Sequence, residues 1–198
     1  MIFRSTALAA AMLATIAPAM VQAQPADPAV QRIEAYNQAL VGVMKQGKAL
    51  GLRGRAERFQ PIVEQYYDNQ AIAALVAGAG WAKASAGDKA ALVAALTRHN
   101  AVSHAGNYKS YDGERFATDG KSVVRGSDRL VRVRIGTTQI VYRLRQTGGQ
   151  WKIVDVVADG ISQIAVQRAD FASTVASSGV GGLAKQLTAM DARTLKGR

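Results

Sequence analysis

The chain has no cysteine and only two histidines among its 198 residues. It can therefore form no disulfide, and it has no acceptor for lipoprotein acylation. His99 and His104 are five positions apart on one expected helix, whereas histidine pairs that bind a metal on a helix are four apart. We expect both histidines at the surface, no metal site and no cofactor, and a fold stabilised by its packed core.

Long apolar runs are missing except at the N-terminus. There Arg4 precedes the apolar residues 6–20, and residues 21–23 give the small-x-small pattern that signal peptidase cuts. The run is shorter than the roughly 20 residues that span a bilayer, which disfavours the alternative of an uncleaved anchor helix. We expect residues 1–23 to be a cleaved secretory signal and residues 24–198 to form a single exported domain.

Acidic residues are scarce, at 14 against 25 lysines and arginines, so the net charge is +11. The excess is concentrated in residues 98–152, where eleven basic residues stand against four acidic ones. A positive surface attracts anionic partners. Because an exported protein meets lipid head groups and acidic proteins, we expect no nucleic acid partner. A solvated face kept positive for solubility is the alternative.

Apolar residues recur every three or four positions in the first half of the chain, as the buried face of a helix requires. The first of these helices is expected to be long and to end near Gly51 and Gly54. Asp68 and Ser85 are suitable N-cap residues for two later helices, because their side chains can accept a hydrogen bond from a free backbone N–H. The four expected helices are at residues 33–50, 59–66, 68–77 and 85–104.

The apolar period then changes to two, which marks strands. Residues 131–135 and 140–145 alternate apolar with mostly basic side chains, and glycines between the runs predict tight turns and antiparallel pairing. Residues 151–158 are apolar on both faces, so we expect this strand to be covered on both sides. A weaker first strand at residues 114–125, with a break or bulge at Gly120, makes four.

Helical spacing returns after Gly160, with an expected end at Gly179 and one last helix beyond it. The order predicts an α+β fold: a curved four-stranded antiparallel meander sheet, packed by N-terminal and C-terminal helices that enclose an apolar cavity. Periodicity alone does not separate such a cavity from a filled core. The candidate cavity residues are Trp81, Leu96, Tyr108, Val131, Val133, Ile135, Ile140, Tyr142, Leu144, Ile164 and Phe171.

No group of residues predicts catalysis. Asp155 and Asp159 share a side of the last strand near Arg168, which favours a structural ion pair over acid–base chemistry. We expect Asp155 to pair with Arg168 and to fix the junction between this strand and the next helix. The glycine-rich residues 179–185 follow a helix and lack the Lys-Ser/Thr of a phosphate-binding loop.

The segment Trp-Lys-Ile-Val-Asp-Val-Val-Ala-Asp-Gly-Ile-Ser at residues 151–162, continued by Arg-Ala-Asp-Phe at 168–171, resembles the signature of the MlaC family, also called toluene-tolerance proteins. In that signature a strand beginning Trp-Lys and carrying an Asp leads through Gly-x-Ser into a helix with Arg-x-x-Phe. Residues 78–81 and 179–187 are similar to further family elements. The matched signature positions are Trp151, Asp155, Gly160, Ser162 and Arg168.

Within the family, residues 40–51 and 160–168 look most like the hopanoid-associated branch, called HpnM. Gln167 is a departure, since many MlaC proteins have tyrosine there. The resemblance implies a periplasmic lipid carrier, not an enzyme. Such a carrier shuttles phospholipid or hopanoid-type lipid between an inner-membrane lipid transporter complex and an outer-membrane lipoprotein or porin complex. We expect a monomer.

Two other classes of function remain open from the residues. Folds with a curved sheet and helices also host small isomerases and dehydratases that use a carboxylate with a tyrosine, for which Tyr142 and Asp155 are the candidate pair. An adaptor that only bridges envelope complexes is the third class. A carrier is expected to copurify with lipid, whereas an enzyme is expected to lose turnover when Asp155 is replaced by asparagine.

Overall fold

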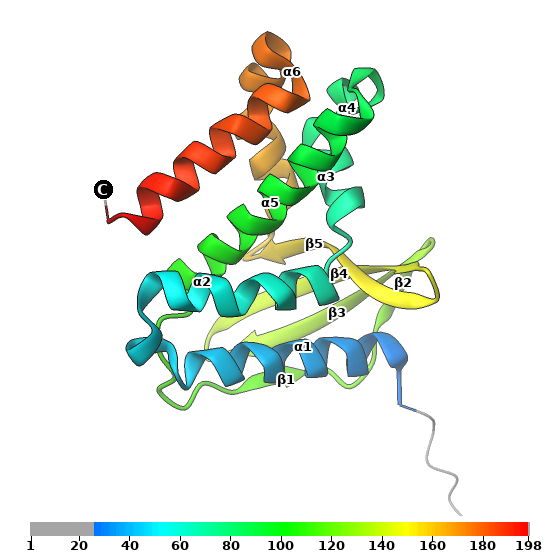
Figure 1. The fold of residues 1–198 in the computed structure, drawn as a ribbon. Coiled ribbons are helices and arrows are strands. Elements are labelled where there is room, and N and C mark those ends of the chain that lie inside the picture. The colour runs from blue at the N-terminus through cyan, green and yellow to red at the C-terminus, as the bar shows by residue number, and fades with distance from the viewer. Residues whose placement is uncertain (1–25, 198) are drawn as a thin grey trace, which may run out of the picture.

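The computed structural model describes residues 26–197 (Figure 1). The expected secretory signal, residues 1–23, lies outside the described residues. Across the described range, no helix combines the length and apolar character that crossing a membrane requires.

Helices and an antiparallel sheet make up the described chain. The helices are α1 (Pro28–Met44), α2 (Gly47–Tyr66), α3 (Asn69–Ala77), α4 (Ala79–Lys83), α5 (Ala86–Asn107) and α6 (Gln163–Leu195). The strands are β1 (Phe116–Thr118), β2 (Val123–Arg125), β3 (Asp128–Ile135), β4 (Thr138–Thr147), β5 (Gln150–Ala158) and β6 (Ile161–Ser162). The mixed architecture was predicted, but the prediction of four strands is wrong, because residues 26–197 form six.

The open sheet has the order β1-β3-β4-β5-β6, and β2 also pairs with β3. The single strand expected at residues 114–125 is split, because the chain turns at Gly120 (φ 74°) and its two halves pair with opposite ends of β3. The sixth strand, β6, is a short return beyond Gly160 that pairs with the end of β5.

The pairing of β4 with β5 contains a β-bulge. Arg143 lies opposite Asp155, whereas Leu144 lies opposite Ile153, so Val154 is the extra residue on β5. A bulge of this kind changes which side chains share a face beyond it. Asp155 is therefore brought beside Arg143.

Helices α1 and α2 lie across one face of the sheet, and α3 to α6 form a helical layer beyond its β5 side (Figure 1). Val131, Val133 and Leu144 on the inner face of the sheet are fully buried in one core with Ile33 and Leu40 of α1. Each such side chain contributes about 1.5–3 kcal/mol by leaving water. The sheet and α1 thus make a filled core along most of their contact.

Side-chain caps begin α1, α3, α5 and α6. Asp68 accepts a hydrogen bond from Ala71 N–H at 2.9 Å, and Ser85 accepts one from Asp88 N–H at 3.1 Å, so both predicted caps are confirmed. Asp27 caps α1 through one carboxylate oxygen, while its other oxygen accepts hydrogen bonds from the backbone and hydroxyl of Ser122. The start of α1 is thereby tied to the segment between β1 and β2.

The first helix ends earlier than expected, at Met44, and α2 begins at Gly47. A side chain at Gly47 would overlap the backbone carbonyl of Lys109, so the close approach to this segment requires glycine. The predicted break at Gly179 is confirmed, since this residue (φ 69°) interrupts α6. The chain turns back beyond it (Figure 1), and Thr174 before the break donates a hydrogen bond of 2.7 Å to Gln186 after it.

Candidate functional site

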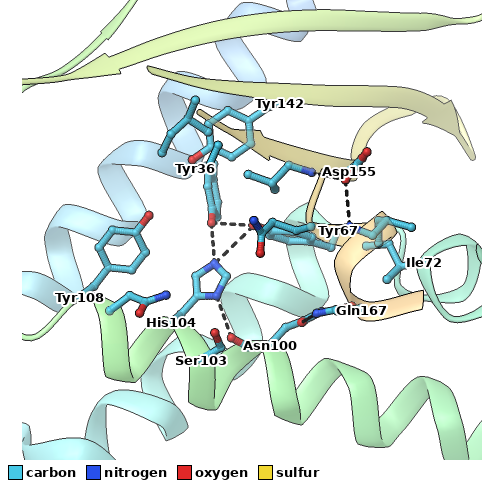
Figure 2. Close-up of a pocket in the computed structure, with 16 residues that line it drawn as sticks. Tyr36, Tyr67, Ile72, Asn100, Ser103, His104, Tyr108, Tyr142, Asp155 and Gln167 are labelled. Carbon is cyan, nitrogen blue, oxygen red and sulfur yellow. Dashed lines mark hydrogen bonds between the residues drawn. The ribbon is translucent and has the colours of Figure 1, made fainter. Parts of the chain in front are cut away.

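A pocket of about 280 Å³ lies where β4 and β5 face α5 and the start of α6 (Figure 2). Wider grooves of about 710 and 820 Å³ lie on the helical layer, but they are more open. The pocket combines apolar walls with converging polar groups, which is typical of ligand sites. Its lining residues are Tyr36, Tyr67, Ile72, Asn100, Ser103, His104, Asn107, Tyr108, Ile140, Tyr142, Asp155, Val156, Ala158, Gln163, Ile164 and Gln167.

The structure places four of the eleven candidate cavity residues on this pocket: Tyr108, Ile140, Tyr142 and Ile164. The other seven lie elsewhere because α1 packs on β3 and β5, while α5 packs on α2 and α6. Leu96, Val131, Val133, Leu144 and Phe171 are buried in the core. Trp81 borders a groove lined by α2, α3, α4 and α5, and Ile135 borders a groove of about 390 Å³ beside Phe116.

Both histidines were predicted at the surface, but each is only partly exposed and is hydrogen-bonded to a buried side chain. His104 lines the pocket, where its Nε2 is 2.8 Å from the hydroxyl of Tyr36 and 3.3 Å from that of Tyr67. The two tyrosine hydroxyls are themselves 2.8 Å apart. His99 lies between α5 and α6, with Nδ1 2.8 Å from a carboxylate oxygen of the buried Asp191.

Sequence reasoning missed the group formed by Tyr36, Tyr67 and His104, which we call the pocket triad (Figure 2). Its members are contributed by α1, the residue after α2, and α5, so no local motif joins them. The available signal was the hydroxyl of Tyr36 on the apolar face of α1, since a buried tyrosine hydroxyl needs a partner.

The hydrogen bonds of the pocket triad have a definite direction. His104 Nδ1 lies 2.7 Å from the carbonyl oxygen of Asn100, which can only accept, so Nδ1 carries the hydrogen. In the neutral ring Nε2 is then an acceptor. Tyr36 donates to Nε2, since this contact is 2.8 Å long against 3.3 Å for Tyr67, and Tyr67 then donates to Tyr36, because each hydroxyl has a single hydrogen.

Burial keeps the pocket triad uncharged. One edge of His104 faces the pocket, but protein surrounds the ring, and this desolvation lowers the pKa of His104 to about 4. Burial likewise raises the pKa of Tyr36, Tyr67, Tyr108 and Tyr142 above the ordinary value for tyrosine. At neutral pH the imidazole is unprotonated and the four phenols retain their protons.

Asp155 fixes the junction between β5 and α6, but not through Arg168 as predicted. Its carboxylate accepts hydrogen bonds from Ser162 Oγ at 2.8 Å, from the backbone N–H of Val156 at 2.8 Å and from that of Ile164 at 3.3 Å. Arg143 is its ionic partner at 3.7 Å. The β-bulge explains the change, because it places Asp155 opposite Arg143.

The remaining signature residues build the same corner. Ser162 caps α6 by accepting a hydrogen bond from Ala165 N–H at 3.1 Å, and Gly160 (φ 82°) makes the turn before it. Arg168 instead packs its guanidinium against Gly78. Trp151 is half-buried with the guanidinium of Arg129 5.9 Å from its ring centroid.

Tyr142 and Asp155 do line one pocket, but the carboxylate already accepts three hydrogen bonds and faces Arg143. A general base needs a free lone pair directed at the substrate. Within residues 26–197 there is also no group of three or more His, Asp or Glu side chains that could hold a metal ion. The geometry is that of a binding pocket.

Acidic side chains form ion pairs with several arginines of the sheet. Arg132 and Arg134 lie 2.9 and 3.4 Å from Asp119. Arg145 makes a two-pronged contact with Asp128 at 2.7 and 3.0 Å, and these hydrogen bonds, with the Coulombic attraction of the arginine, lower the pKa of Asp128. The basic sheet predicted from the sequence is therefore partly neutralised.

The fold and pocket define the class, an α+β protein with a pocket between sheet and helices. A solved structure with this fold is a phospholipid-binding protein from Ralstonia solanacearum in complex with a phospholipid. The TM-score is 0.73 at 16% sequence identity, over 84% of this chain and 98% of that one. No curated protein matches the chain.

The family model described as MlaC protein matches residues 34–189. The chain belongs to the MlaC family. The recognised signature at residues 151–171 lies inside the matched range, and the solved relative supports the fold. Assignment to the hopanoid-associated branch stays a prediction.

Proposed function

We propose that this chain is a periplasmic lipid carrier, and that its ligand binds in the pocket between the sheet and α6. Membership in the MlaC family, whose proteins are periplasmic, is the observation that carries the proposal. The phospholipid held by the Ralstonia solanacearum protein of the same fold supports it. The apolar wall formed by Ile72, Ile140 and Ile164 suits an apolar ligand.

A carrier removes a large energetic barrier. Moving a lipid through water exposes its chains at a cost of about 0.8 kcal/mol per CH₂. We infer that the chain shuttles phospholipid or hopanoid-type lipid between an inner-membrane transporter complex and an outer-membrane lipoprotein or porin complex. Residues 1–23 would direct its export, residues 24–198 would act as a single monomeric domain, and the basic residues of the sheet would attract anionic partners.

The pocket must enlarge for this role. A cavity of about 150 Å³ holds one benzene molecule, so about 280 Å³ accommodates only a small part of a two-chain lipid. The wall that can move is the part of α6 beyond its corner with β5, which carries Gln167. A side-chain hydrogen bond of 3.2 Å from Gln167 to Asn100 holds α6 against α5. We infer that breaking this contact opens the pocket.

The enzyme alternative has less support. A Tyr142–Asp155 pair would need a carboxylate that is free to take a proton, whereas Asp155 is engaged by the backbone, by Ser162 and by Arg143. Asp155→Asn is expected to leave lipid binding in place. The adaptor alternative gives no reason for a pocket with converging polar groups.

The proposal is tested by purifying the mature protein without denaturants, extracting it with organic solvent and identifying lipid by mass spectrometry. We expect about one lipid per chain. Ser103→Phe would fill the pocket from α5 and lower the lipid content, whereas Ser173→Phe on an exposed position of α6 is the matched control. An extract without lipid from the wild type would contradict the carrier function.

A further inference from the structure

The pocket triad contains three acceptor atoms, which are Nε2 of His104 and the two tyrosine oxygens. Only two hydrogens, those of the two hydroxyl groups, can be donated within the group, because Nδ1–H of His104 donates to Asn100. Tyr36 donates to His104 Nε2, and Tyr67 donates to Tyr36. The oxygen of Tyr67 therefore receives no hydrogen bond from the group. Both tyrosines line the pocket, but Tyr67 is 7% exposed and Tyr36 only 1%, so the free acceptor belongs to the more exposed of the two.

A second free acceptor lies on the wall formed by α6. Gln167 donates through Nε2 to Asn100 Oδ1, but its Oε1 is buried without a partner. A buried acceptor without a donor costs free energy, and a ligand that supplies the donor recovers it. Movement of α6 away from α5 would bring this oxygen within reach of an entering ligand.

The pocket holds no charge that a ligand could pair with. His104 is neutral at pH 7 because burial lowers its pKa to about 4. The carboxylate of Asp155 is already engaged by three donors and by Arg143. An ionised group buried there would be desolvated without a counter-charge, which is strongly unfavourable. The ligand end at the pocket triad must therefore be uncharged.

We propose that the wall formed by Tyr67 and Gln167 binds the hydroxyl group of an uncharged lipid end, which donates its one hydrogen to either of these two acceptors. This inference rests on the carrier function proposed above and narrows its ligand. Acyl chains ending in methyl groups supply no donor, and phosphate head groups bring charge. The chemistry of the wall thus selects a lipid alcohol at this position.

Two isomers test the proposal, dodecanol and methyl undecyl ether, because they have the same atoms and only the alcohol can donate a hydrogen bond. Lipid-free mature protein is titrated with each, and binding is followed by displacement of a fluorescent apolar probe. We expect the alcohol to bind roughly five- to a hundredfold more tightly, the range for leaving buried acceptors unsatisfied. Tyr67→Phe combined with Gln167→Met should bring the ratio close to one.

Tyr66→Phe is the matched control, because Tyr66 is buried beside Tyr67 but does not line the pocket. It should keep the wild-type ratio. Equal binding of the two isomers, together with uptake of phospholipid from vesicles, would overturn this inference and leave the carrier function standing. Failure to bind either isomer, with no lipid in the solvent extract, would overturn both.

Discussion

His104 makes the stability of the protein depend on pH between 7 and 5. In the folded protein burial lowers the pKa of His104 to about 4, whereas an unfolded chain has the ordinary value of 6.5. The lowered pKa means that, below pH 6.5, the unfolded state binds more protons than the folded state. Stability from the neutral imidazole is therefore present above pH 6.5 and is lost as the pH falls towards 4.

The size of the effect follows from these two pKa values. At pH 7 the imidazole is mostly neutral in both states, while at pH 5 it is protonated in the unfolded chain and mostly neutral in the folded protein. Proton linkage then lowers the free energy of unfolding by about 2 kcal/mol between pH 7 and pH 5. Protonation would also remove the acceptor for Tyr36 at Nε2.

The comparison that isolates this residue is wild type against His104→Gln, because glutamine does not titrate and can still accept from Tyr36. Denaturant unfolding of the lipid-free protein at pH 7 and pH 5 gives the free energy of unfolding of each. The wild type should lose about 2 kcal/mol more than the variant over this range. Equal losses in the two proteins would refute a neutral, buried His104.

Three further perturbations test the fold and the opening of the pocket. Asp155→Asn should lower the free energy of unfolding by about 1–3 kcal/mol, because the corner between β5 and α6 loses its charge-assisted contacts; an unchanged melting temperature would contradict this. Because the chain has no cysteine, Asn100→Cys with Gln167→Cys introduces a single pair of thiols that a short cleavable crosslinker can join. The crosslink should block lipid uptake from vesicles, and its cleavage should restore uptake. Gly47→Ala should destabilise the protein by about 1–3 kcal/mol, because the added methyl group overlaps a backbone carbonyl. Gly42→Ala, on an open face of α1, should stabilise it by up to about 1 kcal/mol. The same change in melting temperature for both variants would refute the packing argument.

Features set by near neighbours in the chain could be predicted from the sequence. The caps at Asp68 and Ser85, the break at Gly179 and the β3–β4 hairpin around Gly136 depend on hydrogen bonds and dihedral angles within a few residues. Apolar spacing likewise located most helices and the inner faces of β3 and β4, but it missed α4 and the start of α2 at Gly47. The strand count was wrong because the split at Gly120 depends on how two short segments divide one edge of β3.

The site is built from residues that are far apart in the sequence, so local patterns could not predict it. Tyr36 and His104 are 68 positions apart, yet their side chains are hydrogen-bonded. The partner of Asp155 was mistaken because alternation of two along β5 does not reveal the extra residue at Val154. Apolar residues in the middle of the sheet were predicted to line the cavity, but α1 fills that space.

The MlaC signature acts on the pocket chiefly through the placement of α6. Gly160 turns the chain, Ser162 caps the helix, and Asp155 binds both Ser162 and the backbone of Ile164. The first two turns of α6 then form one pocket wall, including Gln167. Because the hydrogen bonds of Asp155 and Ser162 fix this corner while Gln167 reaches α5 through one side-chain hydrogen bond, α6 should pivot at the signature and move away from α5. Replacing Gln167 should therefore speed lipid uptake without the loss of stability expected from replacing Asp155.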